Sequence, residues 1–482
     1  MPYLLMTGAT GLVGRHVLRN LLQADERVAV IVRDGKLASA ADRVNAILRH
    51  FEDELDHALP RPVVIAGDLC SPGAGLNGAP RRWIEANCHR VLHCAASMTF
   101  RKDNHGEPLR TNVEGTQTLL ELCRQCGLRE FHHVSTAYIC GLRDGRILES
   151  EVDLGQRLGN VYEESKLRAE KLIRAAEWLD QVTVYRPASV VGDSRTGYVT
   201  NFHGFYLPLQ LAFLMASQVS VADMNERFLS SLGLRGDEGK NLVPVDWVAA
   251  AISHLLEHPD LHGQTYHLAS PAPVPVSLVQ QVIQHAIERF HPNPLRGLVS
   301  RVDLSAHQAM FQQYMQVYES HWRNDPTFDL THTRRALPHL PCPAMDYDTL
   351  MRIARYPMER NFTVMRHEEV VRDFDMGRHL QRLVAAGQSL TEAPSERVGL
   401  QVNGNGGGQW QLLVEDGRLA GADYGLPKGD SARLYLTAAT FRSLMQRDVT
   451  IEDSLNTGRV LVENSPAQTA TLVPLLTQLI TA

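Results

Sequence analysis

Short apolar runs alternate with longer amphipathic stretches along the first 195 residues of this 482-residue chain. The apolar runs are rich in β-branched residues and have the length of buried strands, whereas the stretches between them have helical spacing. The predicted strands cover residues 3–6, 27–32, 63–69, 90–97 and 131–138. Because strands that alternate with helices form a parallel sheet covered on both faces, the pattern predicts an α/β, doubly wound fold of the Rossmann type.

The middle of the chain is predicted to be mainly helical. Residues 202–217 form an apolar run that is too short to cross a membrane. This run suits an apolar lid or acyl channel, and an ordinary core helix explains it equally well. From about residue 286 to 365 we predict a helical cap over the site described below. Its aromatic residues recur at helix-like spacings and are expected to pack in a core; they are Phe290, Phe311, Tyr314, Tyr318 and Trp322.

The last part of the chain has the pattern of a small α+β domain. Residues 397–482 contain alternating strands, a glycine-rich hairpin at 403–408, a second turn at 416–417 and a final apolar helix at 469–480. The glycine-rich stretch lacks the following helix and the Lys-Ser/Thr pair of a phosphate loop, so we predict a plain hairpin. The predicted domains are a dinucleotide-binding domain over 1–285, a helical cap and linker over 286–390, and the small domain over 391–482.

The first predicted strand leads directly into a glycine-rich turn. There Gly8 permits the tight turn, Gly11 lets a pyrophosphate approach the backbone, and Gly14 lets the following helix pack closely on the strand. The helix N-terminus offers free N–H groups to the phosphates. The expected cofactor contacts in this segment are Thr7, Gly8, Thr10, Gly11, Leu12, Val13, Gly14 and Arg15. The alternative interpretation is a tight strand-to-helix turn that binds no ligand.

The end of the second strand predicts which dinucleotide binds. An acidic residue at this position would bind the ribose 2′-hydroxyl of NAD, whereas a basic residue accommodates a 2′-phosphate. Arg33 occupies the position, and Arg15 could close on the same phosphate. Asp34 follows directly and weakens the argument, and both arginines could instead be solvated surface residues. We therefore expect NADPH rather than NADH.

Further candidate residues follow the other strands of the predicted sheet. Asp68 and Leu69 end the third strand, Ala95 ends the fourth, and Asn112 begins a helix. The fifth strand ends in the hydroxyls of Ser135 and Thr136. Because ligands of such sheets bind at the carboxyl ends of the strands, these residues should converge on one cleft.

A tyrosine and a lysine four residues apart carry the candidate chemistry. Tyr162 and Lys166 lie on the same face of a predicted helix. An ammonium group beside a phenol favours the phenolate, so we expect Lys166 to lower the pKa of Tyr162 and make it a usable proton donor. Such a pair often occurs by chance, and its weight comes from the preceding hydroxyls and the glycine-rich turn.

Together these motifs resemble the extended short-chain dehydrogenase/reductase family over residues 1 to about 270. The resemblance implies that Thr136 holds a substrate carbonyl, that Tyr162 donates the proton, and that Lys166 binds the nicotinamide ribose. It also implies that Asn112 is a structural asparagine and that Asp68 contacts the adenine. Ser135 could be confused with Thr136, and we favour Thr136 as the second residue of the Ser-Thr pair.

Two stretches carry more particular resemblances. The segment 185–197, which contains Pro187 and Ser189, is similar to thioester reductases and fatty acyl-CoA reductases, and the resemblance implies that its loop forms the floor of the nicotinamide pocket. A generic extended-reductase loop is the alternative. The tail resembles a sterol-carrier-protein domain, a module with an apolar tunnel and no catalytic signature. Here it could bind an acyl chain, or serve as a dimerisation or packing element.

Composition narrows the remaining functions. The formal net charge of −6 gives no support to nucleic-acid binding, and no run reaches the length of a membrane span. No signal-peptide pattern precedes the first strand, and an odd number of cysteines suggests reduced thiols, so a cytoplasmic location is expected. We expect no metal site, because the Cys123–Cys126 pair lacks a second ligand pair and His307, His321 and His332 have no ligand spacing.

The sequence therefore supports three hypotheses. The first is an NADPH-dependent reductase that converts a lipidic acyl thioester, bound to coenzyme A or to an acyl carrier protein, to an aldehyde or alcohol. The second is an NADP-dependent dehydrogenase or ketoreductase of a sterol, sugar or polyketide. The third, from another class, is a non-catalytic lipid-binding protein, against which the intact Thr136, Tyr162 and Lys166 argue.

Overall fold

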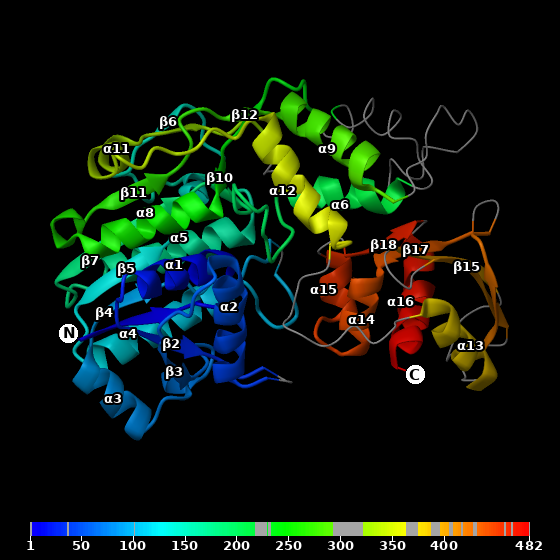
Figure 1. Cartoon of the computed structure of the whole chain (residues 1–482), viewed down its shortest axis with the longest axis horizontal. Coiled ribbons are helices and arrows are strands. Elements are labelled where there is room, and N and C mark those ends of the chain that lie inside the picture. The colour runs from blue at the N-terminus through cyan, green and yellow to red at the C-terminus, as the bar shows by residue number, and fades with distance from the viewer. Residues whose placement is uncertain are drawn as a thin grey trace. The chain divides into compact units, whose positions relative to one another are not determined.

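The computed structural model divides the chain into two compact units whose segments interleave (Figure 1). The first unit comprises Met1–Thr200, Glu238–Val276 and Ser320–Thr349, and the second comprises Asn201–Asp237, Ser277–Glu319 and Leu350–Ala482. The residues that the structure describes are 2–35, 38–100, 102–216, 229, 233–292, 322–362, 375–386, 396–403, 408–415, 418–427, 431–456, 459–463 and 466–481. The three consecutive domains expected from the sequence stay a prediction.

Within the described part of the first unit, seven strands form one sheet. In the order in which they lie side by side, they are β11 (Thr265–Leu268), β7 (Gln181–Pro187), β5 (Glu130–Val134), β4 (Cys88–His93), β1 (Tyr3–Thr7), β2 (Val28–Val32) and β3 (Val63–Ala66). All neighbouring pairs are parallel, which confirms the predicted doubly wound sheet. The chain order reverses between β1 and β4, and sheets of this kind bind ligands at such a switch point, outside the carboxyl ends of the strands.

Helices pack on this sheet through apolar side chains. The helices of the first unit include α1 (Leu12–Gln23), α2 (Ala40–Leu55), α3 (Ala79–Asn87), α4 (Gly115–Gln125), α5 (Val161–Arg174), α8 (Val245–Glu257) and α11 (Thr331–Ala336). One buried cluster joins Leu119 of α4 and Ile173 of α5 to Leu5, Val91 and Phe131 of the strands. The helix α1 packs against α2 and α8. This burial of apolar surface is the main force that holds the sheet and helices together.

Local signals fix where two helices begin. The hydroxyl of Ser39 accepts from the backbone N–H of Asp42, and the Asp42 carboxylate accepts from the N–H of Ser39, which makes a capping box for α2. The Asn160 side chain caps α5 by accepting from the N–H of Glu163 at 2.9 Å. The second cap matters for function, because α5 carries Tyr162 and Lys166.

Short elements complete the first unit. Three strand pairs are present: β6 (Arg146–Ile147) with β13 (Thr327–Phe328), β8 (Ser189–Val191) with β10 (Leu242–Pro244), and β9 (Gly239–Lys240) with β12 (Val274–Pro275). Short helical turns are η1 (Pro72–Gly75), η2 (Arg110–Glu114), η3 (Ala137–Cys140) and η4 (Pro259–Leu261). The pair β8–β10 lies next to the end of β7, and it therefore holds the loop that follows Pro187.

Three longer helices lie largely outside the first unit: α6 (Tyr206–Met215), α9 (Val276–Phe290) and α12 (Tyr347–Glu359). Every residue of α6 is buried, which agrees with the core-helix interpretation of the apolar run. Trp322 is also buried, whereas Phe311, Tyr314 and Tyr318 lie outside the described residues, as do His307 and His321. None of the helices in the described part of the chain has the length and hydropathy that a membrane span requires.

The tail forms an α+β domain with a sheet of its own. Its strands, side by side, are β16 (Arg418–Tyr424), β15 (Gly408–Glu415), β14 (Glu396–Asn403), β17 (Arg433–Thr437) and β18 (Val460–Glu463). Its helices are α13 (Met376–Ala386), α14 (Ala438–Met445), α15 (Ile451–Asn456) and α16 (Pro466–Thr481). β14 and β15 pair antiparallel up to Val402 and Gly408, as the predicted hairpin requires; the turn residues 404–407 and 416–417 lie outside the described residues.

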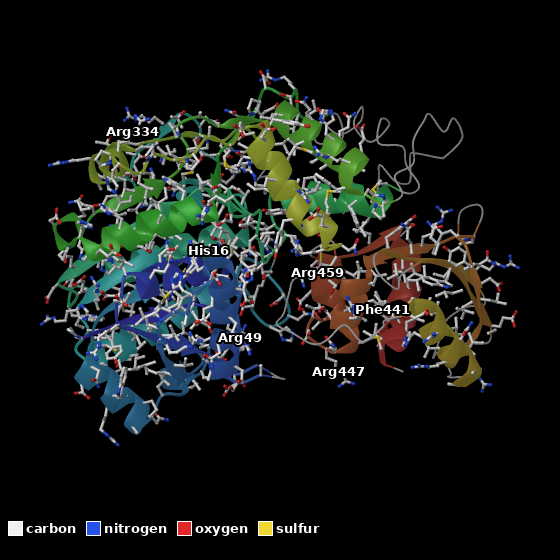
Figure 2. All side chains as sticks on the ribbon, in the orientation of Figure 1. His16, Arg49, Arg334, Phe441, Arg447 and Arg459 are labelled. Atoms are coloured by element: carbon white, nitrogen blue, oxygen red, sulfur yellow. The ribbon has the colours of Figure 1, made fainter. Side chains whose placement is uncertain are left out.

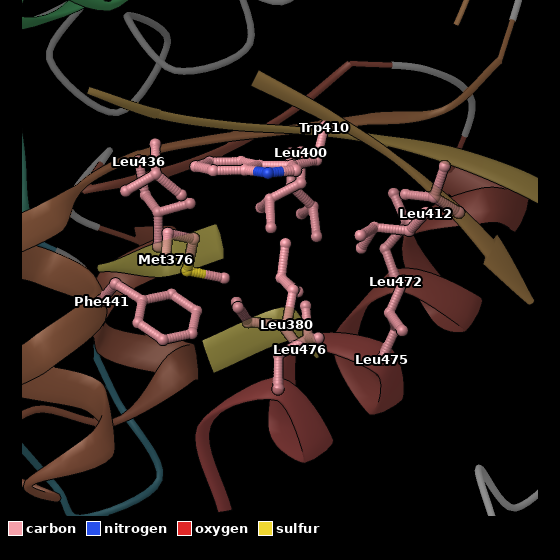
Figure 3. Close-up of a cluster of buried hydrophobic side chains, with 14 of the residues drawn as sticks. Met376, Leu380, Leu400, Trp410, Leu412, Leu436, Phe441, Leu472, Leu475 and Leu476 are labelled. Carbon is pink, nitrogen blue, oxygen red and sulfur yellow. The ribbon is translucent and has the colours of Figure 1, made fainter. Parts of the chain in front are cut away.

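Apolar side chains fill the space between this sheet and its helices. Figure 3 shows Leu400, Trp410 and Leu412 of the sheet above Met376 and Leu380 of α13. The same cluster contains Leu436, Phe441, Leu472, Leu475 and Leu476. The tail therefore has its own hydrophobic core, and the apolar tunnel implied by the resemblance stays a prediction.

Candidate active site

The glycine-rich turn lies at the switch point of the sheet. Gly8 follows β1 with a positive φ of 74°, a conformation that favours glycine. A Cβ at Gly8 would lie 2.4 Å from the backbone nitrogen of Ala95, and a Cβ at Gly14 would lie 2.1 Å from the carbonyl oxygen of Gly8. Both distances exclude a side chain. The backbone therefore has the compact form that a dinucleotide pyrophosphate needs in order to approach it.

The N-terminus of α1 completes this cradle. The N–H of Gly11 donates to the carbonyl of Gly8 at 3.0 Å, and α1 begins at Leu12 without a side-chain cap. The first N–H groups of a helix have no partner within the helix, and they favour anions together with the helix dipole. Thr7, Thr10, Leu12 and Val13 lie in the same segment, where their backbone can contact a cofactor. The residues present thus fit a dinucleotide.

The two arginines predicted to bind a 2′-phosphate lie in different environments. The Arg15 side chain is buried, and it donates to the Tyr198 hydroxyl and to the Thr10 carbonyl. Its donors are therefore engaged within the protein, and this differs from the expectation that Arg15 closes on the phosphate.

Its neighbour His16, labelled in Figure 2, is also buried, and burial lowers the pKa of His16 to about 3.

Arg33, in contrast, is exposed just past the carboxyl end of β2. Its guanidinium is the better candidate for a 2′-phosphate contact. Asp34, which weakened the NADP argument, has a structural contact: its carboxylate accepts from the N–H of Ala40 at 2.7 Å, at the start of α2.

The remaining predicted cofactor residues lie at strand ends. The Asp68 carboxylate accepts from the N–H of Cys70 at 3.0 Å and fixes the turn after β3, beside Leu69. Ala95 follows β4, and its N–H donates to the Thr7 hydroxyl at 3.4 Å. The structure therefore brings these residues to the carboxyl edge of the sheet, on both sides of the switch point.

Asn112 is buried and ties α5 to the segment after β4. Its Oδ1 accepts from the N–H of Ser97 at 2.7 Å, and its Nδ2 donates to the Ser97 carbonyl at 3.0 Å and to the Ser165 hydroxyl at 2.8 Å. Ser165 in turn donates to the carbonyl of Tyr162 at 2.7 Å. These contacts agree with the structural role expected for Asn112.

The structure separates the two hydroxyls that follow β5. The Ser135 hydroxyl donates to the Glu170 carboxylate at 2.7 Å, inside a buried network. The Thr136 hydroxyl makes only a long contact of 3.4 Å to the carbonyl of Pro187, and it accepts from the N–H of Tyr138 at 3.3 Å. Because Ser135 has a strong internal acceptor, Thr136 is the better candidate for a substrate carbonyl.

Tyr162 and Lys166 face this edge from α5. The ring of Tyr162 packs edge-on against Phe100, and its hydroxyl forms no hydrogen bond with any described residue. The Lys166 ammonium is buried and donates to the carbonyl of Val134 at 2.8 Å. Lys166 thus holds the end of β5, two residues before Thr136, and Tyr162 keeps its phenol available.

The electrostatics differ from the expectation in one respect. Burial raises the pKa of Tyr162, and the nearby Glu163 and Cys94 raise it further, so the predicted lowering by Lys166 is wrong for the structure described here. The physical reason is that desolvation penalises the phenolate. Burial also lowers the pKa of Lys166 to about 8. Tyr162 is therefore protonated near neutral pH, as a proton donor must be.

The loop after β7, which the 185–197 resemblance expects to form a pocket floor, is held by backbone hydrogen bonds. The N–H of Ala188 donates to the Leu268 carbonyl and the N–H of Ser189 to the Asn241 carbonyl, both at 3.0 Å. Pro187 ends β7 and contacts Thr136 through its carbonyl. The loop is thereby fixed beside the candidate catalytic hydroxyl.

Comparison with known proteins supports this assignment of the fold. A family model described as male sterility protein matches residues 6–252, which is more than half of the chain. The chain belongs to the male sterility protein family. The matched region contains the glycine-rich turn, Thr136, Tyr162 and Lys166.

Two curated relatives match this male sterility family member over part of their length. The isonitrile lipopeptide synthase of Streptomyces coeruleorubidus is 32% identical over 259 residues, which are 52% of this chain and 16% of that protein. Fatty acyl-CoA reductase 1 of Mus musculus is 28% identical over 206 residues, 41% of this chain and 38% of that protein. The chain thus spans less than half the length of these two curated relatives.

A solved structure resembles a larger share of the chain. The terminal R domain from the myxalamid PKS-NRPS biosynthetic pathway has a TM-score of 0.59 and 26% identity, and the match covers 77% of this chain and 93% of that domain. Together with the family match, this similarity supports an NAD(P)-dependent oxidoreductase of the extended short-chain dehydrogenase/reductase type.

A buried network of hydrogen bonds and ion pairs around Glu170 was not predicted from the sequence. Glu170 accepts from Arg186 at 2.6 Å, from Arg174 at 2.9 Å and from Ser135. Glu170 lies four residues after Lys166, one helical turn further along the same face of α5. That spacing was visible in the sequence, but the partner Arg186 comes from β7 and is brought there only by the fold.

Proposed function

We propose that this protein is an NADPH-dependent reductase that converts an acyl thioester to an aldehyde or an alcohol. The observation that carries the proposal is that Lys166 donates to the carbonyl of Val134 at the end of β5, two residues before Thr136, while Tyr162 lies one turn away from Lys166 on α5. The names of two relatives support the substrate class: a fatty acyl-CoA reductase and the R domain of a PKS-NRPS pathway.

The chain's own residues would act in three steps. Thr136 would donate a hydrogen bond to the thioester carbonyl oxygen and orient it. A nicotinamide held in the glycine-rich cradle would supply the hydride for the carbonyl carbon. Tyr162 would stabilise the oxyanion that forms and give it the phenolic proton. The resulting hemithioacetal breaks its carbon–sulfur bond, releases the thiol and leaves the aldehyde.

Lys166 and Asn112 would support this chemistry without touching the reacting carbon. The Lys166 ammonium holds the Val134 carbonyl, and its positive charge would favour the phenolate that Tyr162 becomes after proton transfer. Asn112 fixes the start of α5 through Ser165 and so sets the position of Tyr162. Arg33, exposed at the end of β2, would bind the 2′-phosphate and select NADPH.

We further propose a lipidic substrate, carried by coenzyme A or by an acyl carrier protein. The resemblance of the tail to a sterol-carrier-protein domain supports this choice. The domain would bind the acyl chain or mediate a homodimer. The free thiols of all seven cysteines support a reducing compartment such as the cytoplasm.

Product analysis tests the proposal. The purified chain is incubated with NADPH and either long-chain acyl-CoA or the corresponding acyl-carrier-protein thioester, and aldehyde and alcohol are quantified. We expect product with at least one thioester and a large loss of rate in Tyr162→Phe, with Tyr424→Phe, an exposed tyrosine of the tail, as the matched control. Turnover of alcohols with NADP but of no thioester would overturn the proposal in favour of a dehydrogenase.

A further inference from the structure

A buried cluster lies at the opposite end of the sheet from the candidate active site. Glu130 begins β5 and His132 is two residues further on, so both side chains lie on one face of the strand. His262 follows the short turn η4 and precedes β11. Thr136 comes after the carboxyl end of β5, so this cluster at the amino end is separate from the reductase chemistry.

The three side chains converge within ligand distance of one another. The Glu130 carboxylate oxygen Oε1 lies 2.8 Å from Nε2 of His132 and 3.0 Å from Nδ1 of His262. All three ligand atoms lie within 4.8 Å of one another. Both histidine side chains are almost completely buried, at 0% and 1% exposed, whereas Glu130 is 27% exposed and reaches solvent.

The contacts of His262 leave one of its ring nitrogens facing the Glu130 carboxylate. Nε2 of His262 lies 2.9 Å from the carbonyl oxygen of Leu255, and because a carbonyl only accepts, Nε2 must carry the proton. In neutral imidazole the buried Nδ1 then has a lone pair, and it has no hydrogen-bond partner. This lone pair faces the Glu130 carboxylate, so a proton or a metal ion must lie between the two acceptors.

His132 has the matching arrangement. Its Nε2 donates to the Glu130 carboxylate at 2.8 Å when no ion is bound; with an ion in the cluster, the Tyr185 hydroxyl, 2.9 Å from Nδ1, would accept the ring N–H and leave the Nε2 lone pair for the ion. Metal-binding histidines commonly donate their second N–H to a carbonyl or another acceptor, and Leu255 and Tyr185 supply these acceptors here.

We propose that Glu130, His132 and His262 bind one divalent transition-metal ion of the zinc class. Two imidazole nitrogens and one carboxylate are a common zinc ligand set, with bond lengths of about 2.0–2.2 Å that place ligand atoms roughly 3.3 Å apart in a tetrahedral site. The observed contacts to Glu130 would lengthen slightly to admit the ion, and the half-open carboxylate side would admit water as a further ligand. The ion would tie β5 to the segment before β11.

The surrounding charge permits a cation. Arg90 is the nearby positive group, and its guanidinium is already paired with Glu26 at 2.9 Å and donates to the carbonyl of Leu256. The Glu130 carboxylate is the acidic group of the cluster. The cluster thus carries a net negative charge when both imidazoles are neutral.

Zinc titration of the full chain tests the site. After treatment with a chelator and removal of the chelator, Zn²⁺ alone is added while heat of binding and thermal unfolding are followed. We expect one ion per chain to be bound by this cluster and to raise the unfolding temperature. Because loss of even a supporting hydrogen bond costs about 10–100-fold in metal affinity, Glu130→Gln and His262→Gln should each bind at least about tenfold more weakly.

The control is His57→Gln, which removes an exposed histidine and should bind Zn²⁺ as the parent protein does. Glu130→Gln keeps the shape of the side chain, so it tests the site even where His262→Gln fails to fold. Absence of stoichiometric binding, or equal binding by the parent protein and Glu130→Gln, would overturn the proposal and leave a proton-held ion pair. Neither result depends on the proposed reductase activity.

Discussion

Glu170→Gln should be among the most destabilising conservative substitutions in the first unit. The Glu170 carboxylate is fully buried and faces the guanidinium of Arg186, which is 1% exposed. It also accepts from Arg174 at 2.9 Å and from the Ser135 hydroxyl at 2.7 Å. Removing one partner of a buried ion pair costs about 3–5 kcal/mol, because the remaining charge stays buried without compensation.

Urea unfolding at pH 7 measures this cost from the shift in midpoint and the slope of the transition. The matched control is Glu164→Gln on the same helix, where the ion pair with Arg168 is long, at 3.4 Å, and about half exposed on both sides. Such surface pairs contribute about 0–1 kcal/mol, so the control should unfold almost as the parent protein does. A loss below about 1 kcal/mol in Glu170→Gln would refute the reasoning.

The same variant has a predictable pH dependence. Burial raises the pKa of Glu170, but Arg186 and the other donors lower it by more, so the pKa is lower in the folded state than its usual value. The carboxylate therefore stabilises the fold above its unfolded pKa of about 4.3, and the contribution is lost as pH falls through the lower folded pKa. The stability difference between the parent protein and Glu170→Gln should narrow in acid.

Three further predictions concern the candidate active site. In Gly8→Ala the new Cβ would lie 2.4 Å from the nitrogen of Ala95. Thermal unfolding should therefore show that the free energy of unfolding falls by about 1–3 kcal/mol, and cofactor titration should show weaker binding. In Arg33→Ala, fluorescence titration should show that the binding free energy of NADPH weakens by roughly 1.5–3 kcal/mol, whereas that of NADH changes little. An equal loss of binding free energy for both cofactors would contradict the 2′-phosphate assignment. Because the pKa of Lys166 is about 8, the rate of reduction should fall above that pH as the ammonium loses its proton. Arginine stays charged at higher pH, so the pH–rate profile of Lys166→Arg should show any such fall at higher pH.

The parallel sheet and the positions of the candidate residues were predictable because local patterns determine them. Apolar runs and helical spacing predicted the strands and helices, and the glycine positions predicted the turn. In the structure this turn approaches the backbone of Ala95 closely. The choice of Thr136 over Ser135 rested on order in the sequence, and the structure adds the reason, since Ser135 donates to Glu170.

Features that depend on long-range contacts were not predictable. Arg15 is held by Tyr198, which lies 183 residues away along the chain, so the sequence could not reveal that its donors are engaged. The pKa of Tyr162 depends on burial by the whole fold, which outweighs the effect expected of Lys166. The pairing of Glu130 and His132 with His262 likewise needs β5 and the segment before β11 to meet.

Transfer of an isotopic label tests the central claim most directly. NADPH carrying deuterium at the transferred position of the nicotinamide ring is supplied with a long-chain acyl thioester, and the aldehyde is analysed by mass spectrometry. We predict one deuterium at the former thioester carbon, with formation of labelled product reduced by about a hundredfold or more in Tyr162→Phe. An unlabelled aldehyde, or equal label transfer by Tyr162→Phe, would contradict the account.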